Sequence, residues 1–220
     1  QLRIQMNPGL IIRPFGPTIY KSTISEDLRQ EILHAAKHSN IDNRDNLAGN
    51  IEREVSYHFS EASIHELQEL LLDYLDQSAK VGCYAAPEGM RLSIDIERPW
   101  VNVQRKGEWN PPHIHSGDFS CVIYASVPEE LKDEWKHPTQ KGNAPTGGMI
   151  EWFYGQWAPH NVTTLGPVAP VEGDIFMFPA WLLHHVYPFN ADVERISCST
   201  NFILKYDKIE NTTTVSGWEE

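Results

Sequence analysis

Cysteine is scarce in this chain, and its spacing argues against a disulfide framework. The three cysteines, Cys83, Cys121 and Cys198, form no C-x-x-C pair, and their odd count cannot be paired completely. Cys121 and Cys198 lie in apolar runs that resemble β-strands, which predicts buried free thiols. Free thiols suit a reducing compartment, so we expect a cytoplasmic protein.

Positive charge is also in short supply. Lys and Arg number 18 against 30 Asp and Glu, which gives a formal net charge of -12. Phosphate binding needs clustered Lys and Arg, so a general nucleic-acid binder is excluded, whereas small metabolites and peptides are compatible partners. Long apolar runs are missing too: no run approaches the ~18 residues of a membrane span. The first residues lack a signal-peptide pattern, so we expect a soluble protein with no membrane partner.

The remaining composition is that of a folded globular chain. With 220 residues, of which 40% are apolar and 10% aromatic, the chain is long enough for one domain with a sizeable core. We expect a single domain over 1–220. Its parts are an N-terminal support over 1–89, a β-strand core over 90–206 and a polar tail over 207–220.

Two helices are predicted in the N-terminal support. The first spans 25–38, with Ser25 as the N-cap and apolar residues at helical spacing. The second opens at Ser63, where Glu66 three residues later suggests a capping box, and ends near Lys80. Residues 39–62 are polar and broken, which predicts a surface loop that could cover a site.

From about Met90 the pattern changes to short strands separated by Pro, Gly and Asn. The predicted strands are 90–96, 100–104, 119–127, 148–154, 174–178 and 195–204. Such spacing is typical of a sandwich, jelly roll or barrel. We therefore predict a mainly β (α+β) protein in which the two helices buttress a β core of roughly eight strands. The polar segment 128–147 is interpreted as an insertion between strands, without a helix.

Histidines in two distant segments suggest a metal site. His113 and His115 stand two apart, and residues i and i+2 of an extended segment point to the same face. A third imidazole can come from His184 or His185. Imidazole suits divalent iron, copper, nickel or zinc, and a mononuclear oxygen-activating site needs three protein ligands with open positions.

A polar strand face near the end of the core suggests an anion site. Arg195, Ser197, Ser199 and Asn201 share one face by parity, while the residues between them share the other. A strand whose interior face carries an arginine can hold a carboxylate, because guanidinium binds carboxylates bidentately.

The motifs around these residues resemble a known enzyme family. An H-x-V-x-P step at 184–188 follows G-D-x-x-x-F-P at 173–179 and precedes R-x-S at 195–197, which resembles the distal half of the iron(II)/2-oxoglutarate-dependent oxygenases. The N-P-P-H-x-H motif at 110–115, with S-x-V-x-Y at 120–124, is similar to one sparsely characterised group of these enzymes. The resemblance covers roughly 90–204 and implies a double-stranded β-helix, or jelly roll.

The resemblance implies roles for individual residues. His113, His115 and His184 would be the catalytic metal ligands for Fe(II), with His185 as the alternative to His184. Arg195 would pair with the C5 carboxylate of the cosubstrate 2-oxoglutarate, and Tyr124 would donate to the same carboxylate. Asn102 and Gln104, on a strand with one polar face, and Ser197, beside Arg195, are further candidates to line the cosubstrate pocket.

One departure from the family pattern leaves alternatives open. Most members have H-x-D or H-x-E, whereas His115 stands in the carboxylate's place here. Asp118 could supply a carboxylate instead, although its offset would require a β-bulge. The leading hypothesis is a 2-oxoglutarate-dependent dioxygenase acting on a small molecule or a peptide. Rival hypotheses are a three-histidine cupin-type dioxygenase that does not use 2-oxoglutarate and a non-catalytic jelly-roll module.

Overall fold

The computed structural model describes residues 9–12, 16–46, 48–136, 146–155 and 163–208. Its helices are α1 (Glu26–His38), α2 (Glu61–Lys80) and α3 (Glu129–Lys136), with one 3-10 turn at Arg44–Asn46. The strands are β1 (Leu10–Ile12), β2 (Ile19–Thr23), β3 (Ile41–Asp42), β4 (Arg53–Ser56), β5 (Met90–Ile96), β6 (Trp100–Gln104), β7 (Asn110–His113), β8 (Phe119–Ser126), β9 (Ile150–Tyr154), β10 (Thr163–Val168), β11 (Asp174–Pro179), β12 (Leu183–Val186) and β13 (Arg195–Lys208). The predicted tail beyond residue 208 and residues 137–145 of the predicted insertion lie outside the described residues.

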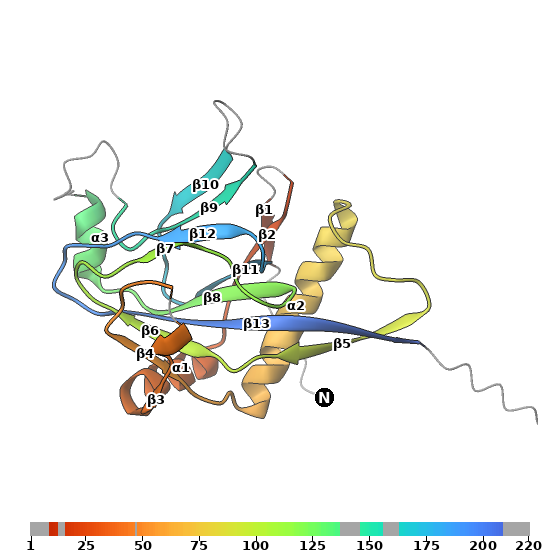
Figure 1. Cartoon of the computed structure of the whole chain (residues 1–220), viewed down its shortest axis with the longest axis horizontal. Helices are drawn as coiled ribbons and strands as arrows, with labels where there is room; N and C mark the ends of the chain where they lie inside the picture. The colour runs from red at the N-terminus through yellow and green to blue at the C-terminus, as the bar shows by residue number, and fades with distance from the viewer. Residues whose placement is uncertain (1–8, 13–15, 47, 137–145, 156–162, 209–220) are drawn as a thin grey trace, which may run out of the picture.

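The strands form two antiparallel sheets that pack against each other. The large sheet has the order β1-β2-β11-β8-β13-β6-β4-β3, with β5 paired to β13. The small sheet has the order β10-β9-β12-β7 and lies above the long β13 in Figure 1. This arrangement is the predicted jelly roll, so the predicted fold class is confirmed. The predicted count of roughly eight strands was too low for the described residues.

Strand alternation divides the apolar residues between two cores. On β8, Cys121 and Ile123 belong to a core shared with α1 and α2, whereas Val122 and Tyr124 belong to a core between the two sheets. Successive side chains of a strand point to opposite faces, so one strand supplies both cores. The same alternation turns the polar face of β13 towards the small sheet, as its sequence predicted. Cys121 and Cys198 are buried and unpaired, also as predicted.

The two long helices pack on the outer face of the large sheet. The prediction of α1 is confirmed, including its N-cap, because Ser25 accepts a hydrogen bond from the backbone of Leu28. The predicted start of α2 was wrong: the N-cap is Ser60, whose Oγ accepts from the backbone of Ser63 at 3.2 Å. Glu66 makes no capping box, because its carboxylate accepts from the backbone and hydroxyl of Ser25, both at 2.6 Å. It therefore ties the start of α1 to α2.

Two segments that the sequence predicted as irregular contain regular structure. Residues 39–62 were predicted as a surface loop, but β3 and β4 extend the large sheet there and β4 pairs with β6. Residues 128–147 were predicted to lack a helix, but they contain α3. Its buried residues are Leu131 and Glu134, and Glu134 is satisfied by the backbone N–H groups of Asn190 and Ala191, each at 2.9 Å.

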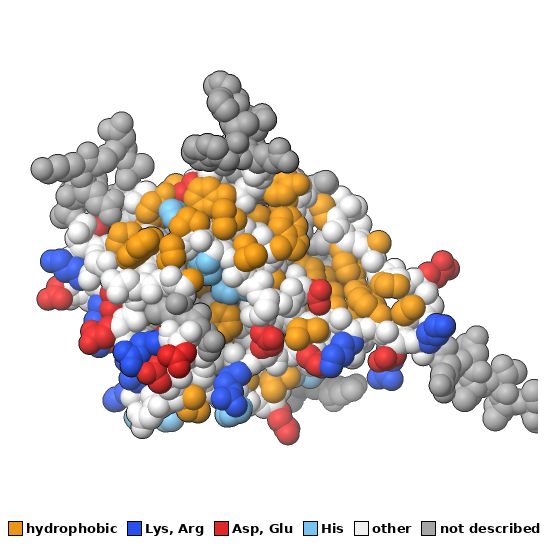
Figure 2. Space-filling view, in the orientation of Figure 1, with side chains coloured by type: hydrophobic (Ala, Val, Ile, Leu, Met, Phe, Trp, Pro, Cys, Tyr) orange, Lys and Arg blue, Asp and Glu red, His pale blue; other side chains and the backbone are white. Residues whose placement is uncertain are grey.

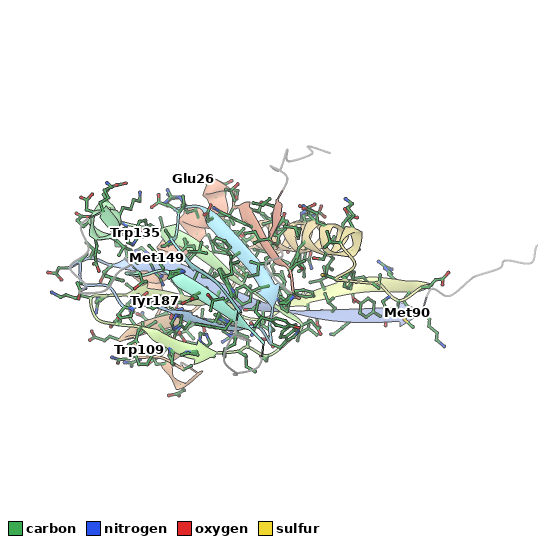
Figure 3. The ribbon with its side chains drawn as sticks, turned by 90° about the horizontal axis from the view of Figure 1, so that it is seen from above. Glu26, Met90, Trp109, Trp135, Met149 and Tyr187 are labelled. Carbon is green, nitrogen blue, oxygen red and sulfur yellow. The ribbon has the colours of Figure 1, made fainter. Side chains whose placement is uncertain are left out.

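The far end of β13 forms an arm with β5. Met90, at the start of β5, lies at the tip of this arm, away from the rest of the protein (Figure 3). The near end of β13, which begins at Arg195 and pairs with β6, lies on the side of α3 (Figure 1). Among the helices of the described residues, none combines the length and apolar character needed to span a membrane.

Candidate metal centre

Two neighbouring strands of the small sheet bring the predicted histidines together. β12 pairs antiparallel with β7, and this register places His184 opposite His113. His115 follows two residues after His113, and its backbone N–H donates to the carbonyl of Ala180 at 2.9 Å. An extended H-x-H step presents both rings on one side of the chain, where the facing strand supplies the third ring.

The three rings form a compact cluster. One ligand nitrogen from each of His113, His115 and His184 lies within 4.8 Å of the others, and the group contains no carboxylate among the described residues. The Nε2 atoms of His115 and His184 are 3.2 Å apart. Ring centroids lie 4.9 Å apart for His113 and His115, 4.3 Å for His113 and His184, and 5.0 Å for His115 and His184. Three imidazoles so close together suit one shared cation.

Backbone carbonyl groups set the tautomer of two of the rings. Nδ1 of His113 lies 2.7 Å from the carbonyl oxygen of Pro111, and Nδ1 of His184 lies 2.8 Å from that of Leu182. A carbonyl oxygen only accepts, so each Nδ1 carries the hydrogen and each Nε2 keeps a lone pair. Such second-shell hydrogen bonds orient metal-binding histidines in many proteins.

Burial also keeps the three rings neutral. Desolvation lowers the pKa of His113, lowers the pKa of His115 to about 4, and holds the pKa of His184 well below its ordinary value. The neighbouring histidines add repulsion between protonated rings to the lowering for His115 and His184. A metal ion binds the unprotonated ring, so the cluster is ready for a cation at neutral pH.

The two alternative ligands point elsewhere. His185 lies on the other face of β12, where its Nε2 is 3.4 Å from the Glu151 carboxylate and its ring packs against Tyr187. Asp118 is exposed, and its Oδ2 accepts from the backbone of Leu204 at 2.7 Å. Neither residue belongs to the cluster of ligand atoms. Asp118 therefore stabilises the edge of β13 and supplies no carboxylate to the centre.

A narrow cavity between the sheets, here called the inner cavity, connects the histidines with Arg195. Its volume is about 30 Å³. The polar residues that line it come from both sheets: Asn102, Gln104, His113, His115, His184, Arg195, Ser197 and Ser199. The structure thus gathers the three predicted ligands and four of the five predicted cosubstrate residues around one space.

Arg195 is a buried cation without an anion. Its side chain donates to the carbonyl of Gly148 at 2.6 Å and, weakly, to Ser197 Oγ at 3.4 Å. It forms no ion pair with any carboxylate of the described residues, and its Nε has no hydrogen-bond partner there. Burial lowers its pKa, but a guanidinium stays charged in proteins. A buried unpaired charge is costly, so this position favours an anionic ligand.

Tyr124, the remaining predicted cosubstrate residue, lies beside that charge. The Arg195 guanidinium is 5.4 Å from the centre of the Tyr124 ring. The Tyr124 hydroxyl is buried and without a partner in the described part of the chain, as is Oδ1 of Asn102. Burial raises the pKa of Tyr124 to about 12, so its hydroxyl remains a proton donor. Two donors, the hydroxyl and the guanidinium, are thus left for one ligand.

The core of this chain also matches a known family in sequence. Residues 98–201 match the model of the family described as "putative 2OG-Fe(II) oxygenase". The predicted resemblance to the 2OG-Fe(II) oxygenases is confirmed. The matched segment contains the three histidines, Arg195 and Tyr124. No curated protein sequence matches the chain.

Several solved 2OG-Fe(II) oxygenases and related enzymes have distantly similar structures. A viral collagen prolyl hydroxylase from Paramecium Bursaria Chlorella virus-1, solved with 2OG, is 14% identical, with 84% of this chain and 94% of that chain covered and a TM-score of 0.49. A prolyl-4-hydroxylase from Pseudomonas putida is 16% identical, with 84% and 91% covered and a TM-score of 0.49. HygX from Streptomyces hygroscopicus, with nickel and 2-oxoglutarate bound, is 10% identical, with 85% and 82% covered and a TM-score of 0.48.

The chemistry of the donor groups fits the two cofactors of a 2OG-Fe(II) oxygenase. Three neutral imidazoles suit divalent iron, and a buried guanidinium beside a tyrosine hydroxyl suits a carboxylate. The assignment of each residue to a role remains a prediction.

A second, larger cavity opens on the other side of His113 and His115, and we call it the outer cavity. Its volume is about 810 Å³, and Trp100 and Asn110 line it together with the two histidines. It also contains Glu54, which sequence reasoning missed because 39–62 was predicted to be a loop. Figure 2 shows histidine side chains near the middle of one face, between apolar surface and a band of charged side chains.

Proposed function

We propose that this protein is an Fe(II)- and 2-oxoglutarate-dependent oxygenase that oxidises a substrate bound in the outer cavity. His113, His115 and His184 would hold the iron. Arg195 and Tyr124 would bind the distal carboxylate of 2-oxoglutarate, and Asn102 and Ser197 would line its pocket. The family match over 98–201 supports the class of reaction.

One observation carries the proposal. Arg195 is 2% exposed, has no anionic partner among the described residues, and shares the inner cavity with three neutral histidines. A purely structural arginine at such depth would be expected to pair with a carboxylate, because an isolated buried charge destabilises the fold. A dicarboxylate between the histidines and Arg195 would place one carboxylate near the histidine-bound metal and the other on the Arg195 guanidinium.

The cofactors, the histidines and the inner cavity would have different roles in the reaction. When bound, iron and 2-oxoglutarate would supply oxygen activation, with 2-oxoglutarate converted to succinate and carbon dioxide as one oxygen atom goes to the substrate. The three histidines would hold the metal where the inner and outer cavities meet. The inner cavity would exclude bulk water, which strengthens every charge interaction inside it.

The absence of a carboxylate ligand has an electrostatic consequence. Three neutral imidazoles leave the charge of a divalent metal undiminished, and Arg195 adds a further positive charge nearby. The doubly negative cosubstrate would offset most of this charge. We therefore expect the centre to bind 2-oxoglutarate tightly and to prefer it over monocarboxylates.

Anaerobic titration tests the proposal directly. Metal-free protein would receive Fe(II) and then 2-oxoglutarate, while the visible charge-transfer band of the chelated keto acid is followed. We expect a band in the wild-type protein, a higher 2-oxoglutarate requirement in Arg195→Gln, and no band in His115→Ala. Asp118→Ala serves as the matched control, since Asp118 lies outside the cluster, and should retain the band.

The reaction products then separate this function from its rivals. Aerobic incubation with 2-oxoglutarate should release succinate even without substrate, at a slow rate. Iron binding without a charge-transfer band and without succinate would point instead to a dioxygenase that uses no keto acid. Failure to bind iron at all would remove the enzyme hypothesis.

A further inference from the structure

The outer cavity has an acidic wall that the proposed reaction does not need. Three carboxylates line it: Asp42, Glu54 and Glu97. Asp42 is already neutralised, because its carboxylate binds the Arg44 guanidinium at 2.6 Å. Glu54 and Glu97 have no ion pair within the described ranges. Both carboxylates are thus available to a cation that comes from outside the chain.

Glu54 lies on the same face of the large sheet as the inner-cavity residues. In the β4–β6 pair, Glu54 is opposite Asn102, and directly opposite residues project to the same side. Val55, the next residue of β4, points to the other side and belongs to the helix-covered core. Glu54 is 3% exposed, and one oxygen accepts from Asn43 Nδ2 at 2.6 Å. Burial raises the pKa of Glu54 to about 7, as expected for a carboxylate that lacks a cation.

A second, independent feature of the wall points to a ligand. Asn201 is 5% exposed and lines the outer cavity, and its Oδ1 has no hydrogen-bond partner in the described part of the chain. Its amide nitrogen is already used, since Nδ2 donates to Glu97 at 2.9 Å and to Ser116 Oγ at 3.3 Å. The free groups of this wall are therefore acceptors, which require a donor from a ligand.

Other walls of the cavity are apolar. Trp100 is half-buried and packs against His115, with ring centroids 5.4 Å apart. Ile41 and Ile114 are exposed at 44% and 57%. Arg98 also lines the cavity, but it is exposed, so solvent screens its charge more than that of Glu54. An apolar stem that ends in a cation would match these walls.

We propose that the outer cavity selects a substrate carrying an ammonium or guanidinium group on an aliphatic chain, with Glu54 as the counter-ion and Glu97 and Asn201 Oδ1 as further acceptors. The volume of about 810 Å³ lies within the range of ligand pockets and exceeds what a single amino-acid side chain needs. The inference builds on the proposed function, since it names the substrate class of that centre. Its test does not depend on turnover.

Binding of small capped amino acids tests the inference. The probes are N-acetyl-lysine methylamide and N-acetyl-arginine methylamide, compared by calorimetry with the neutral norleucine and citrulline analogues. Uncapped lysine and arginine form a second arm, which distinguishes a free amino acid from a residue within a peptide. Each titration uses the full chain, both loaded with Fe(II) under anaerobic conditions and treated with chelator.

The expected result is a preference of about tenfold or more for at least one cationic probe over its neutral analogue. Glu54→Gln, which keeps the shape of the side chain, should abolish that preference. Glu52→Gln is the matched control, because Glu52 is two residues away but pairs with Arg105 outside the outer cavity. Circular dichroism would verify folding, and Glu97→Gln would give a second reading if Glu54→Gln does not fold.

Three results would overturn the inference. These are equal binding of cationic and neutral probes, equal effects of Glu54→Gln and Glu52→Gln, and no binding of any probe at millimolar concentration. The outcome is separate from that of the iron titration. A cation preference without a charge-transfer band would retain the cation site of the outer cavity and remove the 2-oxoglutarate-dependent reaction. A band without a cation preference would retain that reaction and remove the cation site.

Discussion

The inner and outer cavities meet at His113 and His115 but carry opposite charge. The inner cavity holds the buried cation Arg195 and has no acidic residue in its described lining, whereas the outer cavity presents Glu54 and Glu97. Because the two cavities carry opposite charges, each attracts ligands of the charge opposite to its own. An anion is favoured between the sheets and a cation is favoured towards the surface, so cosubstrate and substrate would not compete for one position.

The histidine cluster is the shared boundary, so removing it should have the largest effect. His184→Ala deletes one of three ligands, and we expect the dissociation constant for Fe(II) to rise about 100-fold or more, at least as much as losing a second-shell partner costs. His185→Ala, on the opposite face of β12, is the matched control and should change it little. Equilibrium dialysis with metal analysis would measure both. Equal losses in the two variants would place the centre elsewhere.

The inner cavity should lose its anion preference when its cation is removed. Arg195→Gln deletes the only buried guanidinium of the described lining, and we expect 2-oxoglutarate to bind about 30-fold to 1000-fold more weakly to the Fe(II)-loaded protein. Arg105→Gln is the control, because Arg105 is partly exposed and pairs with Glu52 and Glu194. Unchanged cosubstrate binding in Arg195→Gln would show that Arg195 does not bind 2-oxoglutarate and that its charge pairs with another ligand.

The unpaired carboxylate of Glu54 in the outer cavity should make the free energy of unfolding depend on pH. The folded-state pKa of Glu54 is about 7, above its ordinary value of 4.5, because burial disfavours the charged form and Asp42 adds repulsion. The folded state therefore holds an extra proton between these values. The contribution of Glu54 to the free energy of unfolding is most favourable below about pH 4.5, and it is lost as the pH rises through about 7.

Glu54→Gln should remove this dependence. At pH 8 we expect the variant to be more stable, with a free energy of unfolding about 1–3 kcal/mol higher than that of the wild type. The difference should vanish near pH 4.5. The Asn43 hydrogen bond can be kept, because a glutamine oxygen also accepts. Urea denaturation at both pH values measures the effect, with Glu52→Gln as the control. A variant that is less stable at pH 8 would mean that Glu54 already has a cation.

The two cavities also differ in how far the sequence revealed them. The inner cavity was predictable because its signals are local. The H-x-H step places two side chains within three residues, and the alternation of β13 places others on one face of one strand. Strand parity put Arg195 and Ser197 on one face before their partners were known. The departure at His115 was visible too, although only the structure shows that Asp118 bonds to the backbone of Leu204 instead.

The outer cavity was not predictable because its wall comes from distant strands. Glu54 meets this space only because β4 joins the edge of the large sheet beside β6, and a polar segment gives no local signal for such pairing. α3 was missed for a related reason. Its buried Glu134 interrupts the apolar stripe that would indicate a helix, and the groups that satisfy it lie more than fifty residues later.

The smallest expected effect concerns the supporting contact of Arg195. Ser197 Oγ lies 3.4 Å from the guanidinium, at the limit of a hydrogen bond, so Ser197→Ala should weaken 2-oxoglutarate binding only about two- to fivefold. Ser199→Ala, which lines the same cavity on the same strand face, is the control and should leave binding unchanged. Both dissociation constants come from the charge-transfer titration. A loss in Ser197→Ala as large as that in Arg195→Gln would mean that the Ser197 hydroxyl binds the cosubstrate itself. The anion site would then include Ser197 as a direct ligand beside Arg195.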